Sequence, residues 1–279
     1  MGTGGCSGRS TDRPVRIGGR RRGITYLMYH EIDVAGRSLS RDFSGHVAYA
    51  VPEAELRSQL QYLQEHSWRG ISVSEALSTN ASNAQIDVVI TFDDGSETDL
   101  LAAAPLLEEM NFKATFYVIV GWLGRSGYLS ESQLRALHAQ GFEIACHSMN
   151  HSYLTSLSDI ELYTETAEAK ARLEQILGVR VDHLSCPGGF WNRRVACAAK
   201  RCGYRSVATS RPGVNGGQTD PYCLARISMM RGTALAEFDR LCRGSGLLAR
   251  RTKEAILSAP KFVLGADSYV RIHSLLHRD

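Results

Sequence analysis

The sequence predicts a single α/β domain in which buried parallel strands alternate with helices. Short continuous apolar runs such as DVVITF (residues 87–92) are typical of strands that are covered on both faces. Segments with apolar residues at helical spacing lie between these runs. No linker-like stretch or internal repeat divides the 279 residues. Strands and helices in this alternation form either a barrel or a doubly wound sheet.

The first predicted strand, ITYLMYH (residues 24–30), is followed by a predicted helix at residues 52–67. Leu56, Leu60 and Leu63 share one face of that helix. The next elements, in chain order, are a strand at 87–92, a helix at 98–110, a strand at 113–120, a helix at 130–141 and a strand at 142–147.

The second half of the chain continues the alternation. We predict a long helix at residues 158–178, with Ser158 as its N-cap and Gly178 as its C-terminal stop. The remaining elements are a strand at 183–187, a helix at 192–203, short strands at 206–210 and 223–230, and a helical tail beyond residue 234.

The composition narrows the expected partners and location. A net charge of +3 gives little reason to expect a nucleic-acid partner, and no apolar run reaches the roughly 18 residues needed to span a membrane.

Residues 1–23 are rich in Gly and Arg, lack the apolar core of a secretory signal, and have Cys6 where myristoylation requires Ser or Thr. We interpret them as a disordered basic arm that can make weak contact with an anionic surface. Seven cysteines without a CxxC pair argue against a disulfide framework or a zinc ribbon, so we expect a cytoplasmic protein.

Unusual residues follow four of the predicted strands at their carboxyl ends, where α/β folds collect functional groups. They are Asp93 and Asp94 after VVITF, His147 after FEIAC, Pro187 and Gly188 after HLSC, and His30 after YLMY. We therefore expect these residues to converge on one mouth of the fold.

Two short motifs carry the chemistry. In TFDDG (residues 91–95), Asp93 and Asp94 cannot point the same way, so one can bind a cation while the other accepts a proton. The alternative is a simple Asp-Gly turn. In HSMNH, His147 and His151 would chelate one metal if a helical turn follows the strand, and would otherwise be two unrelated loop residues. Two imidazoles and one carboxylate form a common open catalytic site that suits zinc or another borderline divalent ion.

The order TFDDG then HSMNH within one α/β domain resembles the polysaccharide deacetylases of carbohydrate esterase family 4, the NodB-homology group, over residues 24–231. The resemblance implies a distorted (β/α)7 barrel, which we place at residues 24–233. We expect residues 234–279 to form a helical C-terminal extension packed on it. The resemblance also implies metal-dependent hydrolysis of an N-acetyl group on a sugar, with Asp93 as the general base. Asp94, His147 and His151 would bind the metal ion, for which we expect Zn²⁺, with Co²⁺, Ni²⁺ and Mn²⁺ as alternatives.

The third motif of that family usually reads Arg-x-Pro-Tyr-Gly, whereas this chain has Ser-Cys-Pro-Gly-Gly at residues 185–189. The arginine that steadies the base is therefore missing, and we predict that Arg226 reaches Asp93 from another side of the barrel; the alternative is a surface ion pair. Beside Pro187, the backbone N–H of Gly188 could serve the oxyanion. Trp191 either lines the sugar groove or packs in the fold.

The family's late Leu-x-x-His motif is not evident either, and we interpret His273 and His277 as surface residues. The stretch LMYHEI instead resembles the circularly permuted poly-N-acetylglucosamine deacetylases of biofilm formation, in which the last barrel strand comes first in the chain. That resemblance implies that His30 is the general acid; the alternative is a strand cap. Of the acids that follow it, Glu31 or Asp33 could hold its ring, and strand alternation favours neither. We expect structural or surface roles for the other histidines, which are His46, His66, His138 and His183.

We therefore expect a carbohydrate N-deacetylase, a hydrolase that cleaves linear amides. Its substrate would be an N-acetylated amino sugar in a glycan, a glycoside or a lipid-linked precursor. Two alternatives stay open: a catalytically silent glycan-binding relative, and an amidohydrolase that acts on a non-sugar amide.

Overall fold

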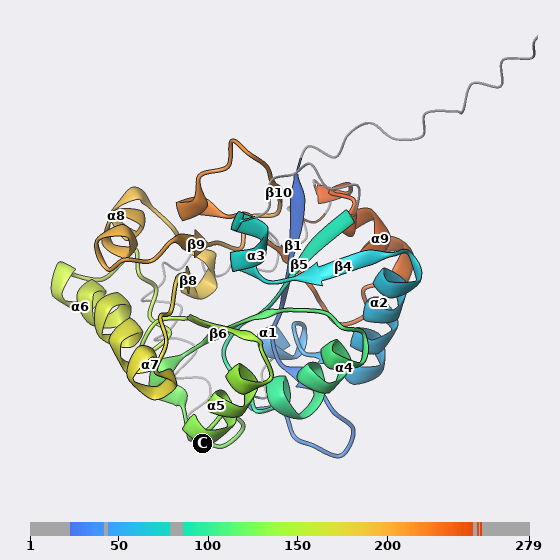
Figure 1. The fold of residues 1–279 in the computed structure, drawn as a ribbon, viewed down its shortest axis with the longest axis horizontal. Coiled ribbons are helices and arrows are strands. Elements are labelled where there is room, and N and C mark those ends of the chain that lie inside the picture. The colour runs from blue at the N-terminus through green and yellow to red at the C-terminus, as the bar shows by residue number, and fades with distance from the viewer. Residues whose placement is uncertain (1–22, 42–43, 79–85, 248–249, 251, 253–279) are drawn as a thin grey trace, which may run out of the picture.

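The computed structural model describes residues 23–41, 44–78, 86–247, 250 and 252. These residues form one α/β domain in which helices surround a curved, mainly parallel sheet (Figure 1). The fold class expected from the alternating pattern is confirmed. Residues 1–22 of the predicted basic arm and the two histidines of the tail, His273 and His277, lie outside the described residues.

The main sheet has the strand order β10-β1-β5-β6-β7-β8-β9, with β11 beside β1 and β4 beside β5. Its strands are β1 (Ile24–Tyr29), β4 (Trp68–Ile71), β5 (Ile86–Phe92), β6 (Thr115–Val118), β7 (Glu143–Cys146), β8 (His183–Ser185), β9 (Ser206–Ala208), β10 (Val214–Asn215) and β11 (Ile227–Ser228). Two further strands, β2 (Ile32–Asp33) and β3 (Val51–Pro52), form a separate pair. The short strands β2, β3, β4 and β10 were not predicted, because two to four residues are too few to show a period.

The segment around Leu224 links the two ends of this sheet. Its N–H donates to the carbonyl of Val207, and its carbonyl accepts from the N–H of Thr209, each at 2.9 Å. Three residues later, β11 begins to pair in parallel with β1 at Leu27. The sheet therefore curls into a distorted barrel, and the first strand of the chain lies between β5 and the last strand.

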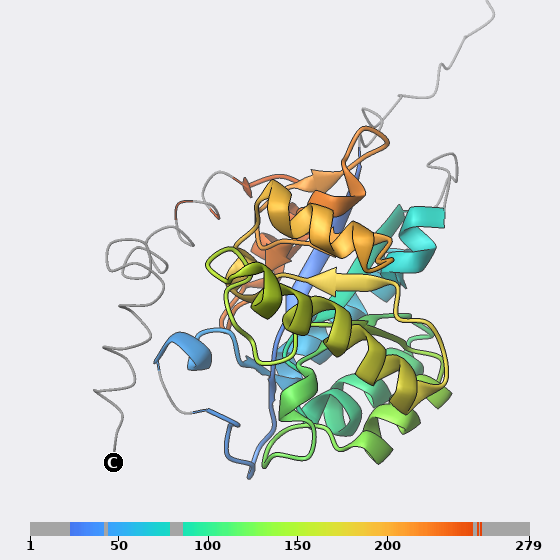
Figure 2. The same ribbon diagram turned by 90° about the vertical axis from the view of Figure 1, so that its left-hand side faces the viewer.

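The helices lie outside the sheet. The longer ones are α2 (Glu53–Glu65), α5 (Glu131–Ala139), α7 (Ala169–Leu177), α8 (Arg193–Arg201) and α9 (Leu235–Cys242). The shorter ones are α1 (Ser44–Val47), α3 (Val73–Ser78), α4 (Ala104–Glu109), α6 (Asp159–Tyr163) and the single turns η2 (Val120–Trp122), η4 (Pro187–Gly189) and η5 (Pro221–Cys223). Figure 2 shows α7 and α8 covering one flank of the sheet.

The helix predicted at residues 158–178 is present but is not uniform. Ser158 caps it in a capping box with Glu161, and Gly178 ends it in the left-handed conformation, as predicted. Its middle, η3 (Thr164–Glu168), is a π-helical segment between α6 and α7, and the helix after β5 likewise begins with a π-helical segment, η1 (Asp99–Ala103). Such segments often lie at functional sites.

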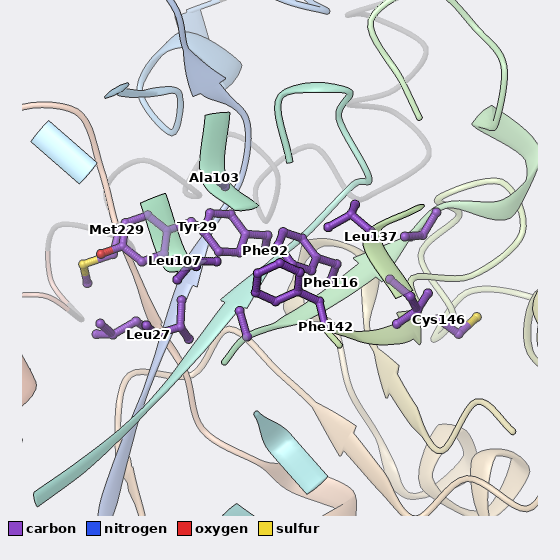
Figure 3. Close-up of a cluster of buried hydrophobic side chains, with 14 of the residues drawn as sticks. Leu27, Tyr29, Phe92, Ala103, Leu107, Phe116, Leu137, Phe142, Cys146 and Met229 are labelled. Atoms are coloured by element: carbon purple, nitrogen blue, oxygen red, sulfur yellow. The ribbon is translucent and has the colours of Figure 1, made fainter. Parts of the chain in front are cut away.

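Alternate residues of the strands face two apolar layers. The larger core lies between the sheet and the helices, where the rings of Tyr29, Phe92, Phe116 and Phe142 follow one another at centroid distances of 4.9 to 5.5 Å (Figure 3). A smaller cluster, which includes Tyr117, lies on the other face. This packing fixes the relative heights of β1, β5, β6 and β7, and therefore the positions of their carboxyl ends.

Part of the expected C-terminal extension packs on the barrel. In α9, Phe238 is buried and meets the ring of Tyr62 edge-on, and the carbonyl of Cys242 accepts a hydrogen bond from Thr25 in β1 at 3.0 Å. Within the described residues, no helix is long and apolar enough to cross a membrane.

Candidate active site

Asp94, His147 and His151 come together at the carboxyl ends of β5 and β7. Oδ1 of Asp94 lies 3.4 Å from Nε2 of each histidine, and the three candidate ligand atoms all lie within 4.8 Å of one another. In the described part of the chain, buried Oδ1 of Asp94 has no hydrogen-bond partner. A lone carboxylate oxygen between two imidazole nitrogens is a donor set that fits a divalent cation.

A strained loop, and not a helical turn, brings the two histidines together. The helical turn that would have placed both rings on one face is not formed, because Ser148 and His151 have φ values of 68° and 63°. The Ser148 hydroxyl accepts the N–H of His151 at 2.9 Å. Buried Glu165, in η3, accepts the N–H groups of Met149 and Asn150, both at 2.9 Å. No local pattern indicates this role for Glu165, because it lies within an amphipathic helix fifteen residues away.

His147 is oriented by a second contact. Its Nδ1 lies 3.0 Å from the carbonyl oxygen of Ser185, which can only accept, so Nδ1 carries the hydrogen and Nε2 faces Asp94. Burial lowers the pKa of His151 to about 3, so this imidazole is neutral. Burial opposes ionisation of Asp94, but His151, His147 and Arg41 outweigh it and hold the pKa of its carboxyl well below the usual range. The set therefore offers one anionic oxygen and an available imidazole nitrogen on His151.

Arg226 forms a bidentate ion pair with Asp93. The two Nη–H groups donate to Oδ1 and Oδ2 of Asp93, each at 2.7 Å. Arg226 is fully buried, so the alternative of a surface ion pair is wrong. Its Nε–H donates to the carbonyl of Thr209 at 3.0 Å, and its guanidinium carbon lies 5.1 Å from the ring centroid of Tyr117.

Ser185 occupies the first position of the divergent third motif, and it joins this pair. Its hydroxyl accepts from Arg226 at 2.7 Å and donates to Oδ2 of Asp93 at 3.1 Å. Burial alone would raise the pKa of Asp93, but the charges of Arg226 and His147 and the hydrogen bonds from Arg226 lower it. Asp93 is therefore an ionised carboxylate in a fixed orientation, 3.8 Å from Nε2 of His147.

His30 follows β1 at the same end of the sheet. It is half-buried, its ring lies 5.2 Å from that of Tyr49, and its Nδ1 has no hydrogen-bond partner among the described residues. Burial lowers its pKa below the ordinary value, and the attraction of Asp94 and Asp93 only partly offsets this. The site therefore holds less of the protonated form than an exposed histidine would.

The expectation that Glu31 or Asp33 holds the ring of His30 is wrong. Glu31 instead accepts from the N–H of Ser40 at 2.8 Å and lies 2.6 Å from Nε2 of His46. Asp33 pairs with Arg231 instead.

The third motif forms a tight turn beside the site. Gly188 has φ of 62°, and a Cβ atom there would lie 2.8 Å from the ring of Tyr153. The ring of Tyr153 packs on that of Phe190 at a centroid distance of 4.8 Å, and both rings lie close to Gly188. The sequence motif, which lacks the family's aromatic residue, did not indicate this pair. Trp191 packs partly against the core, and its indole N–H donates to the carbonyl of Tyr222 at 2.6 Å. Pro187, at the start of the turn, is buried.

The remaining described histidines lie in other surroundings. His46 is buried against Glu31, His183 is buried between Ser74 and Ser206, His66 is exposed beside Tyr62, and His138 lies on α5. One further charged residue, Arg41, was not predicted: its Nη2 donates to Oδ2 of Asp94 at 2.5 Å.

Comparisons with known proteins agree with this arrangement. The family model described as polysaccharide deacetylase matches residues 80–207. A Bacillus subtilis protein, YxkH, whose name assigns it provisionally to the polysaccharide deacetylases, is 27% identical over 231 residues, which are 82% of this chain and 76% of that protein. The peptidoglycan-N-acetylglucosamine deacetylase of Bacillus cereus is 33% identical over 124 residues, so the match spans 44% of this chain and little more than half (56%) of that enzyme.

Solved structures share the fold. The deacetylase PplD of Streptococcus pyogenes, in complex with acetate, superposes with a TM-score of 0.69 at 25% identity over 79% of this chain and 98% of that one. IcaB from Ammonifex degensii superposes with a TM-score of 0.67 at 24% identity over 80% of this chain and 98% of that one.

Proposed function

We propose that this chain is a hydrolase that removes the N-acetyl group from an amino sugar, as the match of residues 80–207 to the family model described as polysaccharide deacetylase suggests. The sugar would be part of a glycan, a glycoside or a lipid-linked precursor. One observation carries the proposal: a carboxylate fixed by a buried arginine, Asp93, stands beside a set of candidate metal ligands in the same mouth. A base next to a cation site is the arrangement that hydrolysis of an unactivated amide needs.

A divalent ion, preferably Zn²⁺, fits Asp94, His147 and His151, because they offer one anionic oxygen and two imidazoles whose ligand atoms already converge. Such an ion, when bound, supplies a Lewis acid that polarises the acetamide carbonyl and makes water more acidic. The Ser185 carbonyl accepts from Nδ1–H of His147, which leaves the Nε2 atom free to bind such an ion.

Asp93 would act as the general base. Its lowered pKa keeps it ionised at neutral pH, and the guanidinium group of Arg226 fixes both of its oxygens while leaving further lone pairs free. It would take a proton from the attacking water as the water oxygen bonds to the acetyl carbon. Arg226 would be a positioning residue that keeps the base ionised.

His30 would act as the general acid. The carbon–nitrogen bond breaks only if the departing amine receives a proton, and His30 stands at the neighbouring strand end, close enough to Asp94 and Asp93 for their charges to affect its pKa. The N–H of Gly188 would support the negative charge that develops on the carbonyl oxygen. The products would be acetate and a free amino sugar. No specific observation favours a silent glycan-binding relative or a non-sugar amide.

Acetate release tests the proposal. The zinc-loaded protein is incubated with N-acetylglucosamine oligomers, peptidoglycan fragments and N-acetyl glycosides, and acetate is measured by mass spectrometry. We expect release from at least one of them, retained zinc but lost turnover in Asp93→Asn, and normal turnover in a matched control at an exposed histidine, His66→Gln. No release from the whole panel, or wild-type turnover in Asp93→Asn, would overturn the proposal.

A further inference from the structure

Arg41 lies at the edge of the candidate metal site. Its Nη2 donates to Oδ2 of Asp94 at 2.5 Å, and its guanidinium carbon lies 4.7 Å from the ring centroid of Trp122. Trp122 in turn lies 5.4 Å from the ring of His151. The Arg41 side chain is 25% exposed, so it belongs to the wall of the mouth and not to the core.

The charge of Arg41 is not needed to balance the site. Arg226 already neutralises Asp93, and a divalent ion at Asp94 exceeds the charge of that carboxylate by one. Arg41 then adds a second uncompensated positive charge. Arg125, 5.8 Å from the ring centroid of Trp122, adds a further one at the rim.

Other acids close to this part of the fold already have partners. Glu97 forms an ion pair with Arg37, and Glu31 accepts a hydrogen bond from the N–H of Ser40 and lies 2.6 Å from Nε2 of His46. In addition, buried Nε of Arg41 has no hydrogen-bond partner in the described ranges. With a divalent ion bound, the site would carry excess positive charge that is only partly exposed to water. Such a site favours a ligand that brings negative charge.

We infer that Arg41 is a specificity-determining residue that binds an anionic substituent, a phosphate or a carboxylate, carried by the N-acetylated sugar close to its acetamide group. The inference rests on the proposed function and names its substrate class. A guanidinium group suits both anions, because its planar donors match their oxygens in pairs. The ring of Trp122, 4.7 Å from the guanidinium carbon of Arg41, stabilises its positive charge through a cation–π contact.

The competing explanation is that Arg41 only orients Asp94. The two explanations predict different effects of replacing Arg41. An orienting residue affects metal affinity, whereas a residue that binds the substrate anion affects the preference for anionic over neutral sugars once the metal is saturating.

Calorimetry on the zinc-saturated protein separates them. The probes are neutral N-acetylglucosamine, N-acetylglucosamine 6-phosphate and N-acetylmuramic acid, which carries a carboxylate. The variants are Arg41→Met, Arg41→Lys and a matched control, Arg37→Met, whose arginine lies on the same loop but pairs with Glu97. Zinc affinity and thermal stability are measured for each variant.

We expect the wild type and Arg37→Met to bind an anionic probe roughly 10–100-fold more tightly than the neutral sugar, the range of a hydrogen bond to a charged group. Arg41→Met should lose that preference, and Arg41→Lys, which keeps the charge but not the planar fork, should keep part of it. Preference for the phosphate or for the carboxylate identifies the substituent.

The inference is overturned if Arg41→Met keeps the wild-type preference, or if it changes only zinc affinity. Should Arg41→Met fail to fold, the comparison of Arg41→Lys with the wild type decides, and an equal preference in these two proteins, or none in either, also overturns the inference. Acetate release from the same samples is recorded separately. Anion preference without release would defeat the proposed function alone, and release without preference would defeat the inference alone.

Discussion

Asp99 is a fully buried carboxyl group at the start of η1, and neither of its oxygens has a hydrogen-bond partner in the part of the chain that the structure describes. Burial, together with the negative charges of Asp94, Glu31 and Asp93, raises its pKa well above the usual range. The folded protein therefore keeps Asp99 protonated at pH values at which the unfolded chain, with a pKa of about 3.9, has released the proton. Folding then binds a proton, so this group lowers stability as pH rises from about 4 toward the folded-state pKa.

Replacement of Asp99 by Asn removes this titration and keeps the size of the side chain. One proton corresponds to about 1.4 kcal/mol per pH unit, so the stability of Asp99→Asn relative to the wild type should increase with pH, by up to about 1.4 kcal/mol per unit, until the folded-state pKa of Asp99 is reached. An unpaired amide costs roughly 1–3 kcal/mol, but that cost does not change with pH. The slope of the difference, and not its absolute value, is the expected signature.

Urea unfolding at pH 5, 6 and 7 in the presence of EDTA measures this slope. The chelator removes bound metal, whose charge would otherwise alter the field at Asp99. Asp159→Asn is the matched control for the replacement itself, since this side chain is 89% exposed. If the curves for Asp99→Asn and the wild type stay parallel across the pH range, Asp99 is ionised in the folded protein and the reasoning fails.

The other predictions concern the site. Arg226→Met leaves Asp93 buried without its partner, so the pKa of Asp93 should rise, the acidic limb of the rate profile should move to higher pH and turnover should fall; unchanged kinetics would contradict this. His30→Ala should lose about 10²–10⁴-fold in kcat while it keeps its zinc content and its fold, and near-normal turnover would make His30 a strand cap. His147→Ala should lose metal binding in calorimetry, and unchanged affinity would remove it from the ligand set. Glu165→Gln should weaken metal binding about 10–100-fold through the loop that it holds, and a wild-type affinity would show that the loop is rigid without it.

The sequence predicted well what depends on local pattern. Parallel strands and helices have clear periods, and residues at the carboxyl ends of parallel strands must share one end of the fold. That rule alone predicted that Asp93, Asp94, His147 and His30 lie at the same end of the fold. It could not show how HSMNH bends, because the bend depends on Glu165, which reaches the loop only after the helix has packed. Arg41 was missed for the same reason, since nothing in its neighbours along the chain indicates a partner 53 residues away.

The divergent third motif shows how a tertiary contact can replace a local one. A long basic side chain at position 185 would occupy the space that the guanidinium group of Arg226 fills, since the Ser185 hydroxyl lies 2.7 Å from it. Serine leaves that space open and adds a hydroxyl that bridges the arginine and Asp93. Arg226 comes from just before β11, the strand that pairs with β1, so the barrel must close before the base acquires its partner. Ionisation of Asp93 is therefore coupled to docking of the last strand, and a chain with that strand undocked would hold a buried carboxylate without its counter-ion, at a cost of several kcal/mol. The same ion pair that prepares the base thus favours a closed barrel.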